Sequence, residues 1–162
     1  MNDTQSPTSI YEDGTYLKRN ESWHQEDSPY KFRYVLKALR RNNIQFSTCA
    51  DVGCGAGLVS ELMAIEFPES KVCGFELSPD AARFWPSRRA LPNLSYSNAN
   101  IFDFEGTFDL IVCLDVFEHV EDYLGFLRNL KAKGRTFVFA IPLDMCVAKL
   151  LTPGIRYARE DV

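Results

Sequence analysis

Residues 51–57 read Asp51-Val52-Gly53-Cys54-Gly55-Ala56-Gly57, between a short apolar run and a helical pattern that begins at Leu58. A strand followed by alternate glycines and then by a helix predicts the first turn of a β-α unit. Glycine suits such a turn because a side chain would block close approach of a ligand to the backbone, or would forbid a positive φ. Open α/β sheets bind ligands at the carboxyl ends of their strands, so the stretch also predicts a ligand site.

Outward from this stretch, short apolar runs alternate with helical patterns. We expect strands near 47–52, 71–77, 94–99, 108–115 and 135–141. Helices are expected from Asp27-Ser28-Pro29 to Asn42, from 58 to 67, from Ser78 until Pro86 ends the helix early, and from Asp122 to a closing Gly134. This alternation predicts an α/β fold, a Rossmann-like open parallel sheet with helices on both faces.

The composition favours one domain and excludes several classes of partner. The 162 residues are 46% hydrophobic and carry a net charge of -4, and the excess acid lies in the first thirty positions. Without a basic block, nucleic acid is not an expected partner. The five cysteines lack zinc-ligand spacing, and no apolar stretch is long enough to span a membrane. We therefore expect a reduced, cytoplasmic protein without a metal site.

Two segments are expected along the chain. Residues 1–27 are polar and turn-rich but carry aromatic residues, so they are interpreted as an arm that could fold over the domain as a lid. Within this arm, His24 beside Trp23 would matter for function only if the arm closes the pocket. Residues 28–162 are interpreted as the ligand-binding domain.

The spacing of the glycines distinguishes between ligands. The pattern acid-x-G-x-G-x-G differs from the dinucleotide pattern G-x-G-x-x-G, in which the helix N-terminus receives a pyrophosphate. A ligand that presents an ammonium and a carboxylate beside a sulfonium fits Asp51 and exposed N–H groups better than a phosphate does. On this ground residues 51–57 resemble the first motif of class I S-adenosylmethionine-dependent methyltransferases. The resemblance implies S-adenosylmethionine as the cofactor.

Glu76 extends the resemblance, because it ends the second expected strand nineteen residues after Gly57. There its carboxylate can accept hydrogen bonds from two ribose hydroxyls, whereas an isolated acid at a strand end would usually be an exposed charge. The family commonly has an acid after the third strand, facing adenine. Here Asn100 takes that place. Its amide can hydrogen-bond the adenine edge, but an asparagine at this position is about equally well explained as a turn residue.

The segment Phe108–Val120, with its Glu-His-Val ending, resembles the fourth-strand block of small-molecule methyltransferases. In that resemblance Leu114 and Asp115 lie beside the sulfonium, and Asp109 is structural. The resemblance, which covers positions 47 to about 142, implies these cofactor-binding residues: Asp51, Gly53, Cys54, Gly55, Gly57, Glu76, Leu77, Asn100, Ile101 and Leu114.

The candidate catalytic residues are His119 and Asp115. An unperturbed histidine has a pKa near 6.5, which suits a proton acceptor at neutral pH. The alternative for His119, which is slightly favoured, is that it only packs or caps the loop. Basic residues at 31, 33, 37, 40 and 41 could meet an anionic acceptor, but a charged helix face is usually solvated.

Missing motifs narrow the reaction. Related methyltransferases that act on an amide or a base amino nitrogen often have an (Asp/Asn)-Pro-Pro-aromatic tetrad, and those that methylate carbon in cytosine have a Pro-Cys pair. This chain has neither motif, and it has no paired acids after the fourth strand for a magnesium site of the catechol type. We therefore expect metal-independent methyl transfer to oxygen, or less favoured to nitrogen or carbon, on a small-molecule, sugar or lipid-linked acceptor. The alternatives are a non-catalytic S-adenosylmethionine-binding or interaction module and, less favoured, an NAD-binding Rossmann protein.

The C-terminal region is short for this family, whose fold has seven strands with an antiparallel pair at the end. About twenty residues follow Pro142, too few for a helix and two strands with their connections. We therefore expect the last two strands to be missing and the strand at 135–141 to present an open edge. Either the chain is C-terminally truncated or a second copy covers that edge in a homodimer.

Overall fold

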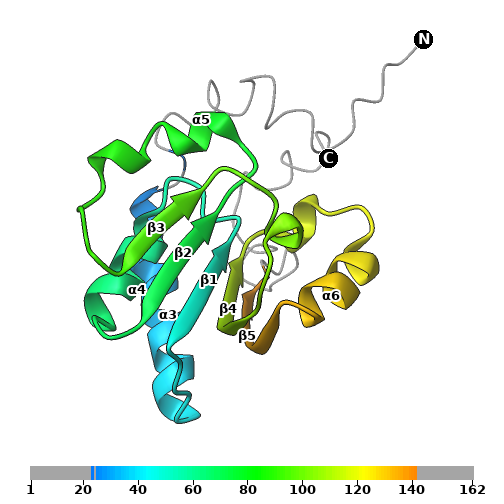
Figure 1. The fold of residues 1–162 in the computed structure, drawn as a ribbon, viewed down its shortest axis with the longest axis horizontal. Coiled ribbons are helices and arrows are strands. Elements are labelled where there is room, and N and C mark those ends of the chain that lie inside the picture. Colours follow the sequence, from blue (N-terminus) through cyan, green and yellow to red (C-terminus); the bar gives the residue numbers. More distant parts are fainter. Residues whose placement is uncertain (1–22, 24, 142–162) are drawn as a thin grey trace, which may run out of the picture.

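The computed structural model describes Trp23 and residues 25–141, which form one five-stranded parallel sheet (Figure 1). The strands are β1 (Thr48–Val52), β2 (Lys71–Phe75), β3 (Leu94–Ser97), β4 (Phe108–Leu114) and β5 (Gly134–Ala140), in the order β3-β2-β1-β4-β5. The chain runs outward from β1 to β3 and then returns to the other side of β1. The strand order therefore reverses between β1 and β4, which is where doubly wound sheets open a ligand crevice.

Within the described residues, α3 precedes the sheet and three further α-helices connect strands, together with short 3-10 turns. The helices are α3 (Ser28–Arg41), α4 (Leu58–Glu66), α5 (Pro79–Ala82) and α6 (Tyr123–Lys131). The 3-10 turns are η1 (Gln25–Asp27), η2 (Trp85–Ser87), η3 (Ile101–Asp103) and η4 (Phe117–His119). No helix within the described residues is long and apolar enough to cross a membrane.

The central strand β4 is buried on both faces, as expected for a parallel sheet between two helical layers. Leu110 and Val112 belong to the core under α3 and α4, whereas Ile111 and Cys113 belong to the core under α6. Figure 1 shows α6 on the other side of the sheet from α3 and α4. Because each buried aliphatic side chain contributes about 1.5–3 kcal/mol, this alternation fixes the register of β4. The sheet confirms the predicted fold class.

One of the predicted helix ends differs from the structure, and one start has the predicted position without a side-chain cap bond. Gly134 does not close α6, which ends at Lys131; it begins β5, where a Cβ would come within 2.7 Å of the side chain of Ile111. Asp27 occupies the cap position of α3 but makes no side-chain cap bond, because its backbone already continues the helical turn of η1. The early end expected at Pro86 is present, since α5 ends at Ala82.

Two predictions lie partly or wholly outside the described residues. The arm was expected at 1–27, and only Trp23 and residues 25–27 of it are described. The segment 143–162, in which the last two strands were expected to be missing, also lies outside. Within the described sheet, β5 is an edge strand.

Candidate cofactor and active site

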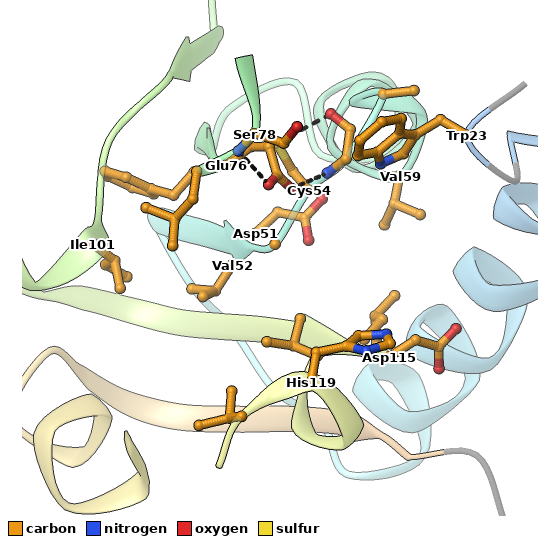
Figure 2. Close-up of a pocket in the computed structure, with 18 of the residues that line it drawn as sticks. Trp23, Asp51, Val52, Cys54, Val59, Glu76, Ser78, Ile101, Asp115 and His119 are labelled. Atoms are coloured by element: carbon orange, nitrogen blue, oxygen red, sulfur yellow. Dashed lines mark hydrogen bonds between the residues drawn. The ribbon is translucent and has the colours of Figure 1, made fainter. Parts of the chain in front are cut away.

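A cavity of about 760 Å³ lies at the carboxyl ends of β1, β2 and β4, at the point where the strand order reverses. Eleven of the twelve residues predicted for the site line it, and Gly57 does not. Figure 2 shows Glu76, Ser78 and Trp23 on one side of this cavity and Asp115 and His119 on the opposite side. The cavity is also lined by residues outside the predicted set of twelve, among them Trp23, Asp27, Ser28, Lys31, Phe102 and Phe126.

The three glycines of the loop after β1 all have positive φ, of 71° at Gly53, 53° at Gly55 and 80° at Gly57. A Cβ would also collide with a neighbouring side chain at each one, with Val116 at Gly53, Trp23 at Gly55 and the Tyr96 ring at Gly57. Backbone conformation and packing against neighbouring side chains therefore require glycine at these three positions, whether or not a ligand is bound.

Gly57 has a different place from the one predicted, because it caps α4 and faces β3. The Tyr96 hydroxyl donates to the Gly57 carbonyl at 2.7 Å, and a Cβ on Gly57 would lie 2.6 Å from the ring. The third glycine thus joins the loop to the sheet. Glycine spacing could not distinguish this role from ligand contact, since both require the same residue.

Glu76 fastens the glycine loop to the end of β2. Its Oε2 accepts from the backbone N–H of Gly55 at 2.9 Å, and its Oε1 accepts from that of Ser78 at 2.9 Å (Figure 2). The sequence predicted a carboxylate for ligand hydroxyls and missed these two bonds. Each carboxylate oxygen has a second lone pair, so Glu76 can position the loop and still accept from a ligand.

Asp51 is a buried acid at the end of β1. Its Oδ2 accepts from the Ser60 hydroxyl at 2.6 Å. Burial raises the pKa of Asp51 to about 6; the Ser60 hydrogen bond and the charge of Lys31 oppose this rise, and the charge of Glu76 adds to it. A carboxyl with this pKa changes charge near neutral pH, and a cationic ligand beside it would favour the ionised form.

Asp115, directly after β4, forms an ion pair that sequence reasoning missed. Its Oδ2 lies 2.5 Å from Nζ of Lys31 in α3, and its backbone is held at a φ of 54°. Non-glycine residues in this left-handed region cost free energy and cluster at functional sites. The sequence left two alternatives for Lys31, contact with an anionic acceptor or, more commonly, a solvated helix face. Lys31 stands four and eight residues before Val35 and Leu39, both buried. That spacing was the available signal that Lys31 faces inward.

His119 and Asn100 reach the cavity from two 3-10 turns. His119, in η4, places Nε2 3.9 Å from Oε1 of Glu118, and its side chain is about two-fifths exposed. Asn100 precedes η3 and its Oδ1 accepts from the N–H of Phe102 at 3.0 Å, which is the turn role anticipated as an alternative. The amide Nδ2 and the second lone pair of Oδ1 are the groups that Asn100 can offer to a ligand.

Asp109 lies at the opposite edge of the sheet, as expected for a structural residue. Its Oδ2 accepts from the N–H groups of Ser47 and Thr48, each at 3.0 Å. These bonds lower the pKa of Asp109. No group of three or more His, Cys, Asp or Glu within the described part of the chain is arranged to hold a metal ion.

Comparison with known proteins gives consistent matches. A family model described as a methyltransferase domain matches residues 22–161. Ubiquinone biosynthesis O-methyltransferases are similar at 25% identity in Rickettsia bellii, with 78% of this chain and 60% of that protein covered, and at 27% in Xanthomonas campestris pv. campestris, with 83% and 62% covered. The chain thus spans about three-fifths of the length of these relatives.

Solved structures share the fold. The plantazolicin methyltransferase BpumL, in complex with SAH, aligns with a TM-score of 0.66 at 16% identity, covering 82% of this chain and 56% of that one. The N-methyltransferase NodS from Bradyrhizobium japonicum, in complex with S-adenosyl-L-homocysteine, aligns with a TM-score of 0.63 at 21% identity, covering 83% and 72%. Because the family model matches more than half of the chain, this protein belongs to the methyltransferase-domain family.

Proposed function

We propose that this chain binds S-adenosylmethionine in the cavity at the carboxyl ends of β1, β2 and β4 and transfers its methyl group to oxygen on a small-molecule acceptor. The observation that carries the proposal is the meeting, in one cavity, of the glycine loop, Glu76 and the Lys31–Asp115 pair. The similar ubiquinone biosynthesis O-methyltransferases favour oxygen as the acceptor atom, and the sequence resemblance favours a small-molecule, sugar or lipid-linked acceptor.

The charges around the cavity suit the two ends of S-adenosylmethionine. The amino acid end is zwitterionic, and the carboxyl of Asp51 and the ammonium of Lys31 both line the cavity. We assign the ligand ammonium to Asp51 and its carboxylate to Lys31, because the N–H groups of Gly53, Cys54 and Gly55 already donate to Phe75 and Glu76. Glu76 receives the ribose hydroxyls, and Leu77 and Ile101 border the adenine.

The reaction is an in-line displacement in which the acceptor attacks the sulfonium methyl and S-adenosylhomocysteine leaves. The sulfonium is a strong electrophile, so holding the two reactants in line supplies much of the acceleration. Leu114 and Asp115 hold the reacting end. His119 lies on the same side as Asp115 (Figure 2), and there it accepts the acceptor's proton or only positions the acceptor.

Titration calorimetry with S-adenosylmethionine, S-adenosylhomocysteine and NAD tests the cofactor. We expect both sulfur ligands to bind and NAD not to bind, and binding of NAD alone would contradict the proposal. Transfer of label from methyl-labelled S-adenosylmethionine to a panel of phenols and lipid-linked phenols tests the activity. Binding without transfer to any acceptor in cell extract would favour a non-catalytic binding module instead.

A further inference from the structure

The Trp23 indole lies directly against the glycine loop. An ideal Cβ on Gly55 would be 2.9 Å from both Cδ1 and Nε1 of that ring, so the indole contacts the bare Cα of Gly55. From another direction, Trp85 Nε1 donates to the Gly55 carbonyl at 3.0 Å. Gly55 is consequently buried although it lines the cavity. One face of the loop is thus covered by a residue that precedes α3 and lies outside the sheet.

Arg88 connects the segment that carries Trp23 to the body of the domain. Its Nη2 donates to Oε1 of Gln25, two residues after Trp23, and its Nη1 lies 3.5 Å from Oε2 of Glu61 in α4. Helix α4 begins directly after the glycine loop. Arg88 therefore ties the chain before α3 to the helix that the loop starts.

The Arg88–Glu61 pair is nearly enclosed, with side chains only 13% and 10% exposed. The Arg88 Nε is buried, with no hydrogen-bond partner among the described residues. The free energy needed to remove two charges from water is comparable to the free energy gained from their attraction. Apolar residues of similar size at such a site often give equal or greater stability. A contribution to stability therefore does not explain this pair well. Its position between the segment that carries Trp23 and helix α4 suggests a role in positioning that segment.

We infer that Arg88 is a positioning residue for the cofactor site: by holding Gln25 against α4, it keeps Trp23 on Gly55 and so maintains the wall of the cavity. The inference rests on the proposed function, since the ligand that benefits is S-adenosylmethionine or S-adenosylhomocysteine. A wall that is ordered before binding spares the ligand the cost of ordering it. Loss of Arg88 should therefore weaken binding without removing any residue that lines the cavity.

Two variants and one matched control test this. Gln25→Ala removes the bond to Arg88 and leaves the Glu61 pair in place, while Arg88→Met removes both. Arg89→Met is the control, because Arg89 also pairs with Glu61, at 3.6 Å, but its side chain is 71% exposed and it makes no bond to Gln25. Calorimetry measures the Kd of S-adenosylhomocysteine. Fluorine NMR of protein labelled with 5-fluorotryptophan measures the solvent isotope shift of Trp23, whose resonance is assigned with Trp23→Phe.

We expect Gln25→Ala and Arg88→Met to raise the Kd about fivefold to tenfold, the cost of ordering a loose side chain on binding, and Arg89→Met to leave it unchanged. The Trp23 isotope shift should increase in the same two variants, and Arg88→Lys should restore part of both effects. If the wild type binds S-adenosylhomocysteine and Gln25→Ala changes neither the Kd nor the Trp23 shift, this inference is wrong. A wild type that binds none would instead overturn the proposed function.

Discussion

The two sides of the cavity are built differently. On the glycine-loop side, the Glu76 carboxylate accepts from the N–H of Gly55, and the N–H groups of Gly53 and Cys54 donate to the Phe75 carbonyl, so the loop is held to the end of β2. On the β4 side, Asp115 takes its partner Lys31 from a helix that precedes the whole sheet, and His119 is partly exposed. Changes on the first side should therefore reduce cofactor affinity and stability, and changes on the second should reduce turnover.

The largest expected effect is at Glu76. Glu76→Ala leaves the N–H groups of Gly55 and Ser78 without their acceptor, and we expect the Kd of S-adenosylmethionine to rise about 100-fold by calorimetry. Asp109→Ala is the matched control, since Asp109 also accepts from two backbone N–H groups but lies at the opposite edge of the sheet. It should lower the Tm and leave the Kd unchanged; equal losses of affinity in both variants would contradict the assignment.

Gly57→Ala should act on the fold of the same side. The new methyl group would meet the Tyr96 ring at 2.6 Å on a backbone with a φ of 80°. Left-handed strain and overpacking together should lower the free energy of unfolding by about 2–4 kcal/mol in urea titration. A variant as stable as the wild type would show that the loop can shift away from β3 at little cost.

Asp115→Gly should separate turnover from stability on the β4 side. Glycine relieves the strain of a φ of 54°, and a partly exposed ion pair contributes little to stability, so the Tm should be kept or raised. Methyl transfer should fall about tenfold because the reacting end of the ligand loses its support. Asp115→Asn, which also tolerates this backbone, separates the effect of the charge; full activity in both variants would exclude Asp115 from the reaction.

The smallest expected effect is that of pH on Asp51, whose pKa is raised to about 6. As the pH falls from 7.5 to 5, the carboxyl gains a proton and the ligand ammonium loses its counter-charge, so the Kd should rise about threefold to tenfold. The stability of the ligand-free protein should change in the opposite direction, because it should increase as the pH falls. A raised pKa means that the folded state binds the proton more tightly than the unfolded state, so this contribution to stability is present at low pH and is lost as the pH rises through 6.

Asp51→Asn is the control for both pH measurements, because it can still accept from Ser60 but cannot ionise. It should flatten the Kd profile below pH 7. A profile that stays as steep in this variant would show that the effect does not come from Asp51.

The sequence predicted the bounds of all five strands to within about two residues, and it predicted that the sheet is parallel. Apolar runs in β1 and β4, bounded by glycine and helical patterns, are local signals that need no knowledge of contacts. The prediction that Gly134 closes the helix was wrong, because a glycine after a helix and a glycine that begins a strand give the same sequence signal. Its role was decided by the Ile111 side chain on the neighbouring strand.

The sequence by itself determined the α/β fold, the loop at 51–57 and the acid at position 76, because each depends on spacing along the chain. Only the tertiary structure decided that Lys31 meets Asp115, that Trp23 covers Gly55 and that Arg88 joins Gln25 to Glu61. These contacts form between segments far apart in the sequence. They depend on how α3 and α4 pack on the sheet, and periodicity shows which side of a helix faces inward but not what it will touch.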